Sequence, residues 1–178
     1  MISLGFDIDG VVLDLVSLIR EYFIDQYQVY FNPEDLGRYN FEEITGLPHD
    51  KVLQVVNEST ADIDGQLANI YPENIEAMYE YYEKTGKPLI FITHRWDIEN
   101  TKKLFSRLFP FKTYKIRYVN PRDSKGLVAK EEKIDLFIDD DVGVAMKMQR
   151  DGVTVVLYEQ PWNLYCPVTK IKSLKEII

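Results

Sequence analysis

The sequence has little cysteine and little histidine: its 178 residues include only Cys166, His49 and His94. A lone cysteine cannot form an internal disulfide, and residues so dispersed do not have the Cys and His spacing of a zinc site. No apolar run approaches the roughly 20 residues of a membrane span, and the N-terminus has no basic leader region. These absences predict an unprocessed, cytoplasmic protein that does not bind membranes.

Positive charge is also scarce. Lys and Arg number 21 against 29 Asp and Glu, which gives a net charge of -8, and the isoelectric point is near 4.8. Polyanions need clustered basic side chains, so nucleic acid polymers are poor candidates for a partner. A small anionic substrate would need positive side chains gathered locally. The hydrophobic content of 46% is enough for the core of one globular domain with a small inserted module.

Short apolar runs alternate with helical patterns along the chain, which is typical of a parallel sheet with crossover helices. The predicted strands are residues 2–6, 88–92, 114–119, 134–138 and 153–158. The predicted helices are residues 71–86, 97–108, 125–132 and 142–151. The final stretch, residues 159–178, is predicted to be an irregular loop followed by a short helix. The predicted fold class is therefore α/β, with an open parallel sheet flanked by helices.

One connection is unusually long. About 80 residues separate the first two predicted strands, whereas a crossover with one helix needs roughly 30. The extra segment combines helical patterns with proline and glycine breakers. We therefore expect residues 15–68 to form a small helical cap, and residues 1–14 and 69–178 to form the core domain.

The stretch "FDIDGVVLD" places Asp7 and Asp9 directly after the first apolar run. Side chains two apart in extended chain share a face, so these two carboxylates would repel one another. Such a pair either raises one pKa or recruits a cation, and Mg²⁺ prefers oxygen ligands. On this motif alone, a hydrated strand end with a turn at Asp9-Gly10 explains the pattern equally well.

Other predicted strands also end in polar side chains. "FITHR" brings Thr93, His94 and Arg95 to the end of the second strand, and "LFIDDD" brings residues 139–141 to the end of the fourth. Each group has an ordinary explanation as a capping or solvated residue. Ligands of open parallel sheets, however, bind at the carboxyl ends of the strands. Their convergence on that edge predicts one functional site.

These motifs, in this order, resemble the four motifs of the haloacid dehalogenase (HAD) superfamily of phosphatases and phosphotransferases. "FDIDG" is similar to the D-x-D motif, "FITHR" to the strand that ends in Thr or Ser, and "LFIDDD" to the acidic metal motif. For the lysine motif, Lys125 and Lys130 are both candidates. The distance to the acidic motif favours Lys125. The resemblance implies a HAD-like, Rossmann-like sheet with a small helical cap inserted after the first strand.

The resemblance implies phosphomonoester hydrolysis in two steps. Asp7 would be the nucleophile that forms an aspartyl-phosphate. Asp9 would protonate the leaving oxygen and then activate water. The presence of Asp9 favours phosphoryl transfer over dehalogenation, because the dehalogenases of the family lack this second acid.

The resemblance also implies a cofactor and a phosphate clamp. Mg²⁺ would be held by Asp7, by Asp9 through its backbone carbonyl, and by Asp139 or Asp140, and the choice between the last two stays open. The expected phosphate contacts come from side chains beside the strand ends, namely Thr93, His94 and Lys125.

Within the superfamily, the chain resembles the 5'(3')-deoxyribonucleotidase group and its bacterial relatives. The resemblance rests on the short chain, the compact cap, "IDDD" and the segment "VVLYEQPWN". It implies a nucleoside monophosphate substrate, with deoxyribonucleotides preferred. Aromatic residues in the cap are candidates for stacking on a base, namely Phe23, Tyr27, Tyr39 and Phe41.

Three alternatives remain. The first is a HAD phosphatase for another small phosphorylated metabolite. The second is a non-catalytic HAD-fold binding module, although such a chain typically loses a motif residue and this one has them all. The third is a phospho-receiver-like module, whose motif order differs from the one found here. The sequence leaves the oligomeric state open, with a homodimer among the alternatives.

Overall fold

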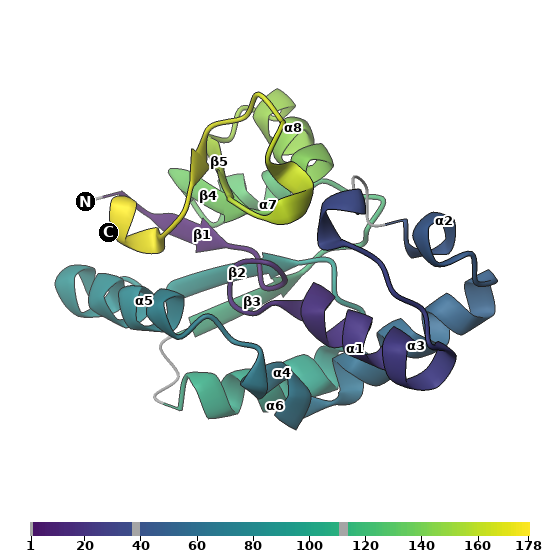
Figure 1. Ribbon diagram of the computed structural model, residues 1–178. Helices are drawn as coiled ribbons and strands as arrows, with labels where there is room; N and C mark the ends of the chain where they lie inside the picture. The colour runs from purple at the N-terminus through teal and green to yellow at the C-terminus, as the bar shows by residue number, and fades with distance from the viewer. Residues whose placement is uncertain (1, 37–39, 111–113) are drawn as a thin grey trace.

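A computed structural model describes residues 2–36, 40–110 and 114–178 (Figure 1). Within them, a six-stranded parallel sheet has the order β3-β2-β1-β4-β5-β6. The strands are β1 (Leu4–Phe6), β2 (Leu89–Thr93), β3 (Tyr114–Tyr118), β4 (Leu136–Asp139), β5 (Val155–Tyr158) and β6 (Lys170–Ile171). The predicted open parallel sheet is confirmed.

Helices cover both faces of this sheet, because alternate side chains of the buried strands point to opposite faces. In β2, Leu89 and Phe91 belong to one apolar cluster, while Ile90 and Ile92 belong to another. The first cluster includes side chains of α5 (Pro72–Thr85) and α6 (Ile98–Leu108). The second includes side chains of α7 (Lys125–Glu131) and α8 (Val142–Arg150). The result is a layer of helices on each side of the strands.

The ends of these helices follow from local chemistry. Pro72 begins α5, where its missing N–H costs nothing, and Gly86 ends it in the left-handed region at φ 67°. Asp97 and Asp141 cap α6 and α8 by accepting hydrogen bonds from backbone N–H groups in the first turn. These signals explain why the four predicted helices agree with the structure to within about two residues at each end.

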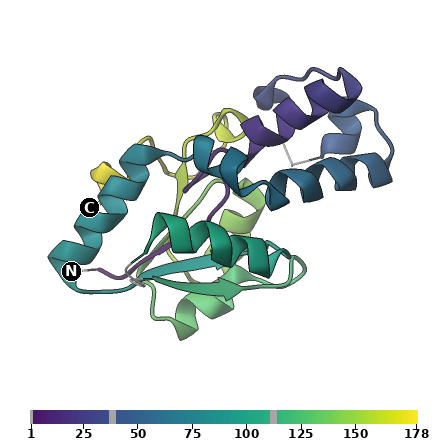
Figure 2. The same cartoon turned by 90° about the horizontal axis from the view of Figure 1, so that it is seen from below.

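Residues 15–68 form a segment that we call the helical insert. It contains α1 (Leu15–Tyr27), the 3₁₀ turn η1 (Pro33–Asp35), α2 (Phe41–Thr45), α3 (His49–Ala61) and α4 (Ile63–Ala68). Figure 2 shows its first helices gathered to one side of the sheet. Its two ends meet, since the Asp14 N–H donates to the Asn69 carbonyl at 2.8 Å.

The C-terminal stretch differs from the prediction. Residues 161–163 and 174–176 form the 3₁₀ turns η2 (Pro161–Asn163) and η3 (Leu174–Glu176), and β6 adds a strand beside β5. A two-residue strand has too little pattern to be recognised in a sequence.

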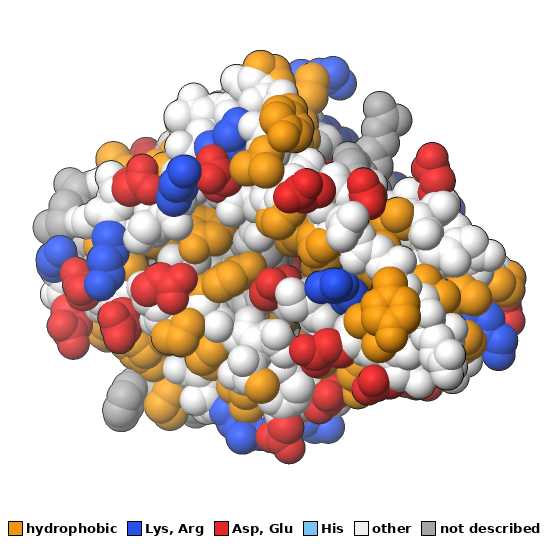
Figure 3. Space-filling view, in the orientation of Figure 1, with side chains coloured by type: hydrophobic (Ala, Val, Ile, Leu, Met, Phe, Trp, Pro, Cys, Tyr) orange, Lys and Arg blue, Asp and Glu red, His pale blue; other side chains and the backbone are white. Residues whose placement is uncertain are grey.

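No helix in the described part of the chain is long and apolar enough to span a membrane. On the face drawn in Figure 3, the described Lys and Arg side chains are scattered among acidic ones.

Candidate active site

The order of the strands brings three polar strand ends together. β1 lies between β2 and β4, with Phe6 in register with Phe91 and with Ile138. Asp7 therefore follows the central strand, while Thr93 and Asp139 are the last residues of its two neighbours. The chain changes direction across the sheet at β1, which is the place where ligands bind in open parallel sheets.

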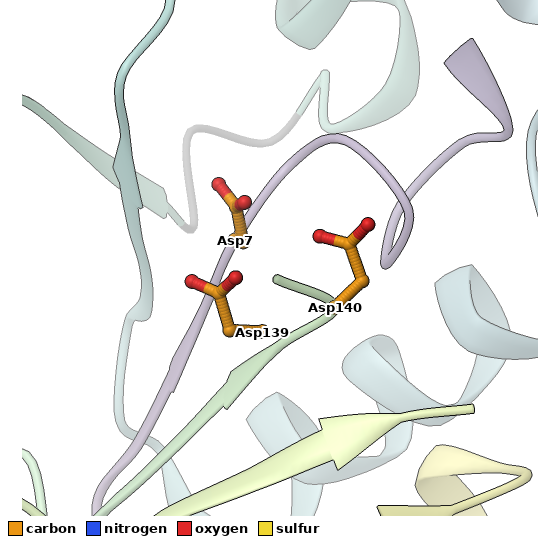
Figure 4. A group of neighbouring side chains, drawn as sticks. All are labelled: Asp7, Asp139 and Asp140. Atoms are coloured by element: carbon orange, nitrogen blue, oxygen red, sulfur yellow. The ribbon is translucent and has the colours of Figure 1, made fainter. Parts of the chain in front are cut away.

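Three carboxylates meet at this edge. Asp7, Asp139 and Asp140 each offer an oxygen, and these oxygens all lie within 4.8 Å of one another. Figure 4 shows their carboxylates projecting toward a common space from the ends of β1 and β4. Their residues are only 8%, 0% and 2% exposed, so water screens their repulsion poorly. A buried set of oxygen donors of this kind fits a hard divalent cation such as Mg²⁺.

Lys125 supplies positive charge inside this cluster. It is the first residue of α7, and its Nζ lies 2.9 Å from Oδ2 of Asp7 and 2.9 Å from Oδ2 of Asp139. Burial opposes the charged amine, but the charges of Asp139 and Asp7 together hold the pKa of Lys125 above its usual value. Lys130, the other candidate, is exposed on the same helix.

One ammonium group does not neutralise three acids. Burial raises the pKa of Asp7 to about 7, Lys125 opposes this shift, and the charges of Asp139 and Asp9 add to it. Burial likewise raises the pKa of Asp139. The cluster therefore favours a further cation, in agreement with its donor chemistry.

Thr93 and His94 lie beside the carboxylates. Thr93 is buried, and its hydroxyl oxygen accepts a hydrogen bond from the Arg95 N–H at 3.1 Å. Among the described residues, Nε2 of His94 is a buried nitrogen without a hydrogen-bond partner. Burial, with the charges of Lys125 and Lys147, lowers the pKa of His94 to about 4. The imidazole is therefore neutral at pH 7.

Gly10 allows the loop after β1 to approach the acidic strand end closely. Its φ of +71° is in the left-handed region, and a Cβ at this position would lie 2.3 Å from the carboxyl group of Asp140. Glycine avoids both the strain and the overlap. From the sequence pattern, this glycine is predicted only as a turn residue.

The segment "QPWN" forms hydrogen bonds with the loops that follow β1 and β4. Trp162 Nε1 donates to Oδ2 of Asp140 at 3.0 Å, and Asn163 Nδ2 donates to the backbone carbonyl of Asp140 at 2.9 Å. Gln160 Nε2 donates to the Gly10 carbonyl at 2.7 Å. Gln160 and Asn163 are buried, and buried amides need partners. In the sequence this segment shows only a likeness to the deoxyribonucleotidase group, and no local pattern indicates that it contacts Asp140.

Asp9 takes a different partner. Its carboxylate is not in the group of three acids but faces Arg95, whose Nε lies 2.9 Å from Oδ2 and whose Nη2 lies 2.5 Å from Oδ1. The sequence pattern places Arg95 at a strand end but does not indicate this ion pair.

A cavity of about 340 Å³ lies over the site. Its polar wall includes Asp7, Asp9, Thr93, Lys125 and Asp140. The helical insert contributes mainly apolar side chains to the lining, namely Leu15, Val16, Ile19, Phe41 and Val56, together with Thr60. His94 and Trp96 also line it. The cavity is thus lined by charged and polar groups from the strand ends and by mainly apolar groups from the helical insert.

The four aromatic candidates for stacking differ in their places. Phe41 lines the cavity. Phe23 is fully buried and packs on Phe41 at a ring centroid distance of 5.8 Å, and Tyr27 packs against the apolar core. Tyr39 lies outside the described residues. Trp96, which follows the second predicted strand and is not among the four candidates, is a second aromatic side chain on the cavity.

Solved structures with the same fold come from several bacteria. CbbY from Rhodobacter sphaeroides, in complex with phosphate, matches 99% of this chain and 96% of its own, with 14% identity and a TM-score of 0.68. β-Phosphoglucomutase from Clostridium difficile matches 100% and 94%, with 14% identity and a TM-score of 0.62. A HAD-superfamily hydrolase of subfamily IA from Geobacter sulfurreducens matches 99% and 97%, with 16% identity and a TM-score of 0.60.

Identities this low show the fold alone, which is HAD-like, as the sequence motifs predict. No protein-family model matches the sequence, and a comparison with curated proteins gives no match.

Proposed function

We propose that this chain, which has the HAD-like fold, is a Mg²⁺-dependent phosphomonoester hydrolase that works through an aspartyl-phosphate on Asp7. The observation that carries the proposal is the buried cluster of Asp7, Asp139 and Asp140 around Lys125, with Thr93 on the adjoining strand end. Carboxylates and an ammonium group arranged around one cavity suit the transfer of an anionic phosphoryl group.

In the first proposed step, a carboxylate oxygen of Asp7 attacks phosphorus, and the bond from phosphorus to the ester oxygen breaks. Asp9 donates a proton to that departing oxygen. In the second step, Asp9 takes a proton from water as the water oxygen attacks phosphorus. The bond to Asp7 then breaks, and inorganic phosphate and the free carboxylate result.

The remaining residues bind and orient the phosphoryl group. Thr93 and Lys125 would donate to its oxygens, and His94 borders the same space as a neutral ring. Mg²⁺, held by Asp7, the Asp9 carbonyl and Asp139 or Asp140, would supply the charge that offsets repulsion between the phosphate and the nucleophile.

We further propose that residues 15–68 form a small cap domain over a core of residues 1–14 and 69–178, and that the cap selects a nucleoside monophosphate, preferably a deoxyribonucleotide. The support is the apolar wall that the helical insert presents to the cavity. Such a wall suits the face of a base, whereas the hydroxyl groups of a sugar would lose hydrogen bonds to water against it.

A panel of esters tests both proposals. The chain is incubated with Mg²⁺ and with deoxyribonucleoside and ribonucleoside monophosphates, sugar phosphates that include β-glucose 1-phosphate, and an aryl phosphate, and released phosphate is measured. Hydrolysis of deoxyribonucleotides at the highest kcat/KM supports the nucleotidase proposal. Faster hydrolysis of a sugar phosphate would overturn the nucleotidase proposal but would still support the phosphatase proposal. Without phosphate release from any ester, the phosphatase proposal fails.

A further inference from the structure

The Asp9 carboxylate is held by one guanidinium group. Arg95 Nε lies 3.1 Å from Oδ1 and 2.9 Å from Oδ2 of Asp9, and Nη2 lies 2.5 Å from Oδ1. Arg95 is only 7% exposed. A planar guanidinium that bonds both oxygens of a carboxylate fixes the rotation of that carboxylate as well as its position.

The same guanidinium also reaches the helical insert. Its Nη1 donates to Oε1 of Gln66 on α4 at 2.8 Å, and Gln66 Nε2 donates to the backbone carbonyl of Thr60 on α3 at 2.8 Å. Gln66 is fully buried, and Thr60 lines the cavity. A continuous set of hydrogen bonds therefore connects Asp9, through Arg95, to two helices of the insert.

We propose that Arg95 is a positioning residue that orients the Asp9 carboxylate beside the cavity. Through its hydrogen bond to Gln66, this orientation depends on how the helical insert packs against the rest of the chain. The role of Asp9 in this inference rests on the proposed function. The hydrogen-bond chain itself is a feature of the fold.

The hydrogen bonds that the Arg95 guanidinium already makes favour a role in positioning Asp9 over a direct contact with substrate. Arg95 borders the cavity, but all three of its guanidinium nitrogens already donate to Asp9 or to Gln66, which leaves one N–H on each of Nη1 and Nη2 for another partner. Oδ1 of Asp9 accepts two of these bonds and Oδ2 accepts one. Since a carboxylate oxygen can accept about two hydrogen bonds, Oδ2 keeps one free position, which can carry the proton that Asp9 donates to the ester oxygen or accept a hydrogen bond from a water molecule.

The chain offers a matched control. Arg107 on α6 donates to Asp64 on α4 at 2.7 Å, so it too joins the core to the helical insert. Its side chain is 56% exposed and that of Asp64 is 86% exposed. Exposed ion pairs contribute little, so Arg107→Gln should change kcat and KM by less than about twofold.

The experiment compares Arg95→Gln with Arg107→Gln in the full chain, using an alkyl and an aryl phosphate with Mg²⁺. For Arg95→Gln we expect kcat on the alkyl phosphate to fall on the order of 100-fold, as misplaced catalytic groups do. On the aryl phosphate, whose leaving oxygen needs less protonation, kcat should fall only a few-fold. The KM of each ester should stay unchanged. Gln66→Leu should give the same pattern more weakly.

Two other kinetic outcomes would overturn the inference. A rise of KM for both esters at constant kcat would make Arg95 a ligand of the phosphoryl group. An equal fall of kcat on both esters would mean that Arg95 has only a structural role. Arg95→Lys keeps the charge but cannot span both oxygens and Gln66, so it provides the same comparison if the glutamine variant does not fold.

A second measurement does not need activity. Hydrogen exchange of the amides in residues 49–68 reports how firmly α3 and α4 are held. Faster exchange in both Arg95→Gln and Asp9→Asn, with no change in Arg107→Gln, supports the connection. Unchanged exchange in the first two variants would overturn it. If the wild-type chain hydrolyses no ester, the proposed function has failed, and this exchange measurement alone decides whether Arg95 joins Asp9 to the insert.

Discussion

The two walls of the cavity differ in kind. The sheet wall consists of polar and charged groups at or just after the ends of β1, β2 and β4, with Lys125 from α7. The insert wall consists mainly of apolar side chains on α1, α2 and α3. The sheet wall can recognise little more than a phosphoryl group and a cation, so discrimination among esters falls to the insert wall. The comparison indicates that reaction and selectivity can be altered separately.

The largest effect is expected for the nucleophile. Asp7→Asn should lower kcat for every ester by about 10⁴-fold or more, because an amide neither attacks phosphorus nor supplies an anionic ligand. Thermal unfolding and phosphate release are measured together. Asp64→Asn, an exposed acid on the insert, serves as the control and should retain activity. Turnover by Asp7→Asn would contradict the assigned role.

Metal removal should be nearly as severe. EDTA should abolish activity on all esters and added Mg²⁺ should restore it, since three buried acids with one lysine lack sufficient positive charge. Asp139→Ala and Asp140→Ala should each raise the Mg²⁺ concentration needed for half-maximal activity. Activity in metal-free protein would show that the acidic cluster is structural.

Gly10 allows a sharper test of the sheet wall. Gly10→Ala should weaken Mg²⁺ activation by at least about tenfold, because the added methyl group would displace the Asp140 carboxyl group. Gly86→Ala is the matched control. Its φ is +67°, but nothing lies within 4 Å of the added Cβ. Both variants should lose some stability, and only the first should need more Mg²⁺. The same requirement for Mg²⁺ in both would refute the overlap argument.

Phe41 tests the insert wall. If its ring stacks on a base, Phe41→Leu should raise KM for nucleotides by about 3- to 10-fold and leave the aryl phosphate nearly unchanged. Phe31→Leu is the control: Phe31 packs in the same aromatic cluster, at a centroid distance of 6.0 Å from Phe41, and does not line the cavity. Equal effects of the two substitutions would mean that Phe41 acts only through packing.

The smallest effect concerns His94. Its pKa falls from 6.5 to about 4, so the folded chain binds this proton less readily than the unfolded chain does. The histidine therefore costs stability as pH falls from about 6.5 toward 4, and has no such effect above that range. Urea unfolding of wild type and His94→Gln at pH 7 and pH 5 should show a smaller acid-induced loss in the variant. Equal losses would mean that the surroundings of His94 do not disfavour its charged form.

The sequence predicted the sheet wall better than the insert wall. Asp7, Thr93 and Asp139 each stand at the end of an apolar run, so their positions depend on local patterns that can be read along the chain. In the insert, Phe23 and Phe41 have the same sequence character. Only their packing places Phe41 on the cavity and Phe23 inside the aromatic cluster.

The order of the first five strands, the helices between them and the residues at their ends can be read from the sequence alone, because apolar periodicity and capping residues act over a few positions. Tertiary structure decided which of these residues meet. The Arg95–Asp9 pair joins residues 86 positions apart, and the hydrogen bond from Gln160 to Gly10 spans 150. Such pairs depend on strand order and loop geometry, which result from the packing of the whole chain and leave no periodic trace in any one segment.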